Sequence, residues 1–163
     1  MNASRWMWAL AAALFLAGAV AAWIKVRPLL YPEMLQVAPL STACDLRSGP
    51  CETEFPDGAR VAFELFPRHI PLVKELKIAV HTHGIEASAV EVDFAGVDMN
   101  MGFNRSHLAR VGPGEFSGTG VLPVCVRNRM SWEAKVLIHT DAGLLAAPFR
   151  FDTYRSGASP SER

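Results

Sequence analysis

The sequence predicts an all-β fold, an immunoglobulin-like antiparallel β-sandwich preceded by one N-terminal transmembrane helix. Three observations predict it. Residues 6–24 form an uninterrupted apolar run, later segments alternate apolar and polar residues with a period of two, and turn-forming residues separate those segments. Alternation of this kind places one face of a strand on a core and the other in water. A barrel of similar size is the alternative architecture.

The apolar run predicts a helix that spans a membrane. Residues 6–24 carry no charged side chain, and as a helix at about 1.5 Å per residue they reach roughly 28 Å, the hydrocarbon thickness of a bilayer. Trp6, Trp8 and Trp23 lie at its two ends, where indole rings favour the headgroup layer. We predict a signal anchor that follows a short tail, residues 1–5.

A cleaved secretory signal is the alternative interpretation. Arg5 supplies a positive start, and Ala17-Gly18-Ala19 suits a signal peptidase. However, the run is longer than a usual signal core, and residues 23–27 form an aromatic and basic border after it. We therefore expect an uncleaved single-pass protein of the inner membrane. The cysteines place its C-terminal domain in the periplasm, because disulfides persist in oxidising compartments.

Size and composition limit what the rest of the chain does. The chain has 163 residues and no net charge. We expect a proline-punctuated linker at 25–43, one β-sandwich domain at 44–152 and a disordered tail at 153–163. No basic stripe points to nucleic acid. Because no phosphate loop, zinc-protease motif or nucleophile elbow occurs, we predict that the protein is not an enzyme.

The alternating segments are the expected strands of the sandwich. They occupy residues 61–65, 76–83, 90–94, 132–136 and 145–151. Turn chemistry separates them at residues 56–58, 112–114 and 141–143. About seven or eight short strands at this spacing are typical of a sandwich. Pro148 cannot donate to a ladder, so the last strand should lie at an edge or carry a bulge.

Three cysteines raise the question of pairing. Cys44 and Cys51 enclose a turn-rich loop, and a disulfide is the default in an exported domain. A metal-binding or disulfide-exchanging thiol pair is the alternative, although six intervening residues fit neither a redox motif nor a zinc knuckle. The remaining Cys125 is either a buried small hydrophobe or a soft metal ligand. Met130 follows five residues later, within reach of a loop that folds back.

The segment around Met99 and Met101 is the sharpest local feature. Two methionines at i and i+2 on an extended segment point the same way. Thioethers are soft and neutral, and such ligands select Cu(I) over harder ions. The alternative is that both methionines fill irregular space beneath a loop. His107, six residues after Met101, would complete a copper site, although nearby arginines are as typical of a plain polar surface.

A second histidine pattern lies on one expected strand. His81 and His83 share a strand face, which makes a two-histidine metal edge geometrically feasible. Lys77 lies on the same face and favours the alternative of a solvated surface.

The whole pattern resembles a known family. One transmembrane helix, an immunoglobulin-like domain and the segment Val97-Asp98-Met99-Asn100-Met101-Gly102 are similar to the small FixH-like and YtkA-like periplasmic proteins over roughly residues 5–152. The later strands through residues 149–151 add to the likeness. The resemblance implies copper handling or the assembly of membrane respiratory oxidases, and only Met99 and Met101 carry over from it. The Cys44–Cys51 loop and residues 122–126 lie outside the family pattern.

Together these features predict a membrane-anchored periplasmic copper-binding protein that delivers Cu(I) during respiratory oxidase assembly. The expected metal ligands are Met99 and Met101, completed by Cys125, Met130 or His107. The expected partners are the lipid bilayer and a respiratory complex or copper acceptor protein. The alternative is a structural module without metal that docks on a membrane complex, with the methionines as an adaptable apolar contact.

Overall fold

The computed structural model describes residues 3–30, 34–41, 44–99, 102–123 and 128–154. The chain divides into two compact units, Met1–Glu33 and Met34–Arg163. The first is helical and the second is built of strands. The prediction of an all-β domain with one N-terminal helix is confirmed.

The helix α1 runs over Ala3–Leu30. Within it, Trp6–Val26 is long and apolar enough to cross a membrane, and no other helix among the described residues passes that test. The side chains of this span are exposed, and Trp8 and Phe15 are both at least three-quarters exposed. By length and composition such a helix suits a membrane anchor or a signal sequence.

The β unit holds nine strands in its described part. They are β1 Met34–Val37, β2 Cys51–Glu54, β3 Arg60–Phe66, β4 Glu75–His83, β5 Ala89–Gly96, β6 Arg105–Gly112, β7 Glu115–Val121, β8 Arg129–Thr140 and β9 Gly143–Tyr154. They form one mixed sheet in the order β1-β9-β8-β5-β6-β7-β4-β3-β2. Only the β1–β9 pair among these described strands is parallel.

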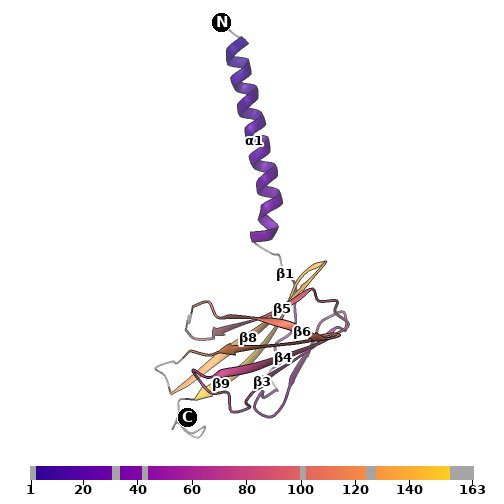
Figure 1. Cartoon of the computed structure of the whole chain (residues 1–163), viewed down its shortest axis with the longest axis vertical. Helices are drawn as coiled ribbons and strands as arrows, with labels where there is room; N and C mark the ends of the chain where they lie inside the picture. The colour runs from indigo at the N-terminus through magenta and orange to yellow at the C-terminus, as the bar shows by residue number, and fades with distance from the viewer. Residues whose placement is uncertain (1–2, 31–33, 42–43, 100–101, 124–127, 155–163) are drawn as a thin grey trace. The chain divides into compact units, whose positions relative to one another are not determined.

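The sheet curls, so strands far apart in its order face each other (Figure 1). Phe63 of β3 stacks on Phe149 of β9, with 5.2 Å between the ring centroids. The core lies between these faces and contains Trp132, which is fully buried and donates a hydrogen bond from Nε1 to Thr153 Oγ1 at 2.9 Å. Closure into an immunoglobulin-like sandwich stays a prediction.

The helix and the strands do not end at the expected domain bounds. The expected linker, residues 25–43, is partly helical, because α1 continues to Leu30. Pro28 removes one backbone hydrogen bond near the helix end without ending the helix there. The same linker also contributes β1, so the β unit begins at Met34 rather than at residue 44. At the other end, β9 extends to Tyr154, and residues 155–163 lie outside the described residues.

Pro148 is buried and lies on β9, which is not an edge strand but is left by β1 before this position. It pairs with Lys135 of β8, whereas β1 covers only the first part of β9, from Leu144 to Ala146. Pro148 has no backbone N–H to donate. At this position no described strand pairs with β9 on the side away from β8, so no hydrogen bond of the ladder is lost.

The predicted disulfide is confirmed. Cys44 and Cys51 are joined, with 5.6 Å between their Cα atoms. The loop they close carries Leu46, which is fully buried in the core. The disulfide therefore fixes the chain that leads into β2.

We expect the Cys44→Ala, Cys51→Ala variant to lose about 2 kcal/mol of unfolding free energy, because closing even a short loop restricts the unfolded chain. Urea unfolding of the full chain in detergent micelles, followed by β-sheet circular dichroism, measures the loss. The parent protein under reducing conditions is the control and should unfold at the urea concentration of the variant. An unchanged midpoint in both samples would show that the disulfide adds no stability.

Candidate functional site

The register of the strands brings several chain segments to one end of the β unit. At this end, named the loop end here, β5, β7 and β9 finish and β4 and β8 begin. The pairs Glu75–Val121, Gly96–Trp132 and Arg129–Tyr154 define it. The segment after β5, which carries the two candidate methionines, and the connection between β7 and β8, which carries Cys125, both emerge here.

Hydrogen bonds tie the segment after β5 to β8 and β7, the two strands that flank the connection carrying Cys125. The Val97 amide donates to the Ser131 carbonyl at 3.0 Å, and the Asn104 side-chain amide donates to the Val121 carbonyl at 3.0 Å. The first bond anchors the methionine segment beside the start of β8. The second anchors its other side at the end of β7. The methionine segment therefore adjoins the end of β7 and the start of β8.

The described candidate ligands at this end are both in apolar surroundings. Met99 is partly buried and packs against the hydrophobic core. Met130, on β8, is buried within the core itself. Met101 and Cys125 lie outside the described residues. The position of Met99 agrees both with a soft metal ligand and with a residue that fills space in the core. The burial of Met130 favours a packing role for that residue.

His107 lies within β6, beside Glu91 of β5. It pairs in register with Glu91 on β5, and its Nδ1 is 2.8 Å from Glu91 Oε1. Gly96, where β5 ends, lies five positions along the strand from Glu91, which is roughly 16 Å at about 3.3 Å per residue. The structure therefore does not bring His107 to the loop end.

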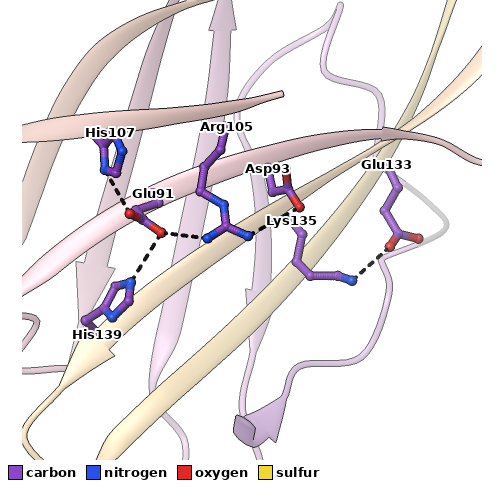
Figure 2. Close-up of polar contacts among 7 residues, drawn as sticks. All are labelled: Glu91, Asp93, Arg105, His107, Glu133, Lys135 and His139. Atoms are coloured by element: carbon purple, nitrogen blue, oxygen red, sulfur yellow. Dashed lines mark hydrogen bonds and ion pairs between the residues drawn. The ribbon is translucent and has the colours of Figure 1, made fainter. Parts of the chain in front are cut away.

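Glu91 is instead the centre of a polar network on the outer face of β5, β6 and β8. Figure 2 shows three side chains converging on its carboxylate. His107 contacts one oxygen, while Arg105 at 3.3 Å and His139 at 3.4 Å contact the other. Arg105 also reaches Asp93, at 3.7 Å. Since basic side chains occupy both carboxylate oxygens, the network is suited to joining three strands.

Sequence reasoning missed this network. The alternation around Glu91 predicts that its side chain faces away from the core, but the partner strand β6 has no alternating pattern of its own. In the described part of the chain, no three His, Cys, Asp or Glu side chains are gathered closely enough to hold a metal ion as they stand.

A second polar cluster secures the start of β8 beside Met130. Asp152 accepts hydrogen bonds from Ser131 Oγ at 2.6 Å and from Arg129 Nη2 at 2.7 Å, and Arg47 donates to its backbone carbonyl. Burial alone raises the pKa of Asp152, but the hydrogen bonds from Ser131 and Arg129 and the charges of Arg129 and Arg47 outweigh it, so the pKa lies below its usual value.

We expect Asp152→Asn to lower the unfolding free energy by about 1 kcal/mol at neutral pH, a value reduced for partial exposure. A carboxylate whose folded-state pKa is lowered stabilises the fold above its unfolded pKa, near 3.8, and that stabilisation is lost as the pH falls through the folded pKa. Unfolding measured from neutral pH to below pH 3.8 should therefore show parent and variant converging in acid. Asp141→Asn, at the exposed β8–β9 turn, is the control; a constant gap at every pH would contradict the assignment.

Comparisons with protein-family models, with curated proteins and with solved structures found no match for the chain.

Proposed function

We propose that this protein is a membrane-anchored copper-binding protein whose β domain faces the periplasm, and that it holds Cu(I) with sulfur ligands at the loop end. The observation that carries the proposal is that the segment bearing Met99 is bonded to β8 and β7, the strands that flank the connection bearing Cys125, by the Val97–Ser131 and Asn104–Val121 hydrogen bonds. Met99 and Met101 are the proposed primary ligands, and Cys125 completes the set.

The chemistry of these ligands suits Cu(I). Thioether and thiolate sulfurs are soft donors, and thioethers stay available at any pH because they do not titrate. Met99 lies against apolar surroundings, which excludes competing water from one side of the ion. A site of two or three sulfurs can pass its ion to an acceptor by ligand exchange, without a catalytic step.

The proposed location rests on two features. The apolar helix Trp6–Val26 suits an anchor, and the Cys44–Cys51 disulfide is typical of an oxidising compartment. The resemblance to FixH-like and YtkA-like proteins supports a role in respiratory oxidase assembly.

The test is an oxygen-free Cu(I) titration of the full chain, with its Cys44–Cys51 disulfide intact, in detergent micelles against a chromogenic chelator. We expect one Cu(I) per chain, bound tightly enough to compete with the chelator. Zn(II) at equal concentration should displace little of it, because thioethers bind hard ions poorly. A chain that takes no copper from the chelator would refute the proposal.

One observation favours a second candidate function, a docking module for a membrane complex. The loop end exposes large apolar side chains: Phe103 is 80% exposed and Val73 is 63% exposed. Arg105 lies over the Phe103 ring, 4.9 Å from its centroid. Exposed aromatic and arginine side chains are enriched in protein interfaces. Membrane pull-down with Phe103→Ser distinguishes the two functions: a docking module loses its partner in this variant, while Cu(I) binding is retained.

A further inference from the structure

The end of the sheet opposite the loop end carries a groove of about 300 Å³. There β4 finishes and β7 begins, and the groove is lined by His81, His83 and Glu115 from these two strands. Ala62 of β3, the cross-strand neighbour of His81, also lines it. The small side chain of Ala62 leaves the space beside His81 open.

The register of β4 and β7 sets the three polar side chains on one face. His81 and His83 are two residues apart on a strand, so both side chains point to the same side. Glu115 is the direct cross-strand partner of His81, and 3.9 Å separates Glu115 Oε1 from His81 Nδ1. The pattern is two imidazoles on one strand and a carboxylate on its neighbour.

A tight turn fixes Glu115 in this place. The Thr82 amide donates to the Gly114 carbonyl at 2.7 Å. Gly114 has a φ of +70°, and a Cβ there would come within 2.5 Å of the Thr82 carbonyl oxygen. Only glycine allows this close approach, so the turn holds the start of β7 against the His81–His83 strand.

We propose that His81, His83 and Glu115 bind a divalent transition-metal ion, Cu(II) or Zn(II), in this groove. Imidazole suits both ions, and two histidines with one carboxylate form a recognised ligand set. The side chains of His81 and Glu115 are about half exposed, so they are free to rotate inward onto an ion. The strand register puts the three side chains on one face, and the open groove supplies the room for them to turn onto an ion.

The charges around the groove allow a cation. Arg60, which pairs in register with His83, would repel it, but Arg60 Nη1 forms an ion pair with Glu52 Oε1 at 3.2 Å. Removing the Arg60 charge should therefore strengthen binding, whereas removing a ligand should weaken it. The proposal is independent of the Cu(I) site, because the ligands differ in softness and lie at the other end of the sheet.

The experiment is calorimetric titration of the full chain, free of any histidine tag and in detergent micelles, with Zn(II). We expect His83→Gln and Glu115→Gln to weaken binding about tenfold or more, since even the loss of an outer-shell contact costs roughly that much. Arg60→Gln should tighten binding about two- to fivefold, a gain that misfolding cannot produce. With Cu(II) as the probe, electron paramagnetic resonance should show coupling to two imidazole nitrogens.

His107→Gln is the matched control, because it removes an exposed histidine from the Glu91 network and should leave Zn(II) affinity unchanged. Retained affinity in His83→Gln would overturn the proposal, and so would an equal loss in His107→Gln. If Cys125 held the zinc instead, Zn(II) binding would be unchanged by the histidine substitutions, and the proposed site in the groove would be wrong.

Discussion

Replacing Met99 and Met101 together by leucine should weaken Cu(I) binding by the full chain about a hundredfold or more, because each substitution removes a soft donor. Leucine preserves the volume and the apolar character of methionine, so the packing of Met99 against the core should suffer little. The measurement is the chelator competition used for the parent chain, with circular dichroism to confirm the fold.

Met34→Leu is the matched control for this variant. Met34 is half exposed on β1, and its partner Leu144 lies near the start of β9, away from the loop end. The same chemical change there should leave copper affinity unaltered. Parental affinity in the Met99 and Met101 double variant would remove both residues as ligands.

The second large effect concerns stability. Trp132→Ala should lower the unfolding free energy by about 3–5 kcal/mol, because it empties the largest fully buried side chain in the described core. The Thr153 hydroxyl, itself buried, would also lose its donor. Small domains are stable by only about 5–15 kcal/mol, so this loss would remove a large share of the free energy of unfolding.

Trp132→Phe separates the two contributions to this loss. It keeps most of the ring volume but leaves Thr153 without its donor, and the Trp132→Phe, Thr153→Val double variant removes that unpaired hydroxyl. Urea unfolding of the three variants should rank Trp132→Ala as the least stable. A loss below about 1 kcal/mol for Trp132→Ala would contradict the place of this residue in the core.

The strands with clean alternation were predictable from the sequence. In β4, every second residue from Leu76 to Val80 is buried. The alternation of apolar and polar residues in the sequence is enough to predict this strand. In β6, by contrast, Leu108 is the only buried residue, so no period is visible. Its partner β7 holds Gly118, where a Cβ would lie 2.7 Å from Leu108 Cδ2. Close backbone approach, rather than alternation, joins these two strands.

The candidate site could be predicted only in part, because periodicity reveals which face a residue occupies but not which strand lies beside it. The sequence singles out Met99 and Met101 by residue type. It does not reveal that the segment after β5 adjoins the end of β7, since that follows from strand order. The same limit hid the contact between His107 and Glu91.

The most direct test of the copper proposal is X-ray absorption at the copper edge of the full chain carrying one equivalent of Cu(I). We expect a first shell of sulfur only, at about 2.3 Å, without imidazole scattering, because His107 lies away from the loop end. This shell should disappear in the Met99→Leu, Met101→Leu variant. A shell of nitrogen or oxygen ligands, or a sulfur shell that is unchanged in that variant, would contradict the copper proposal.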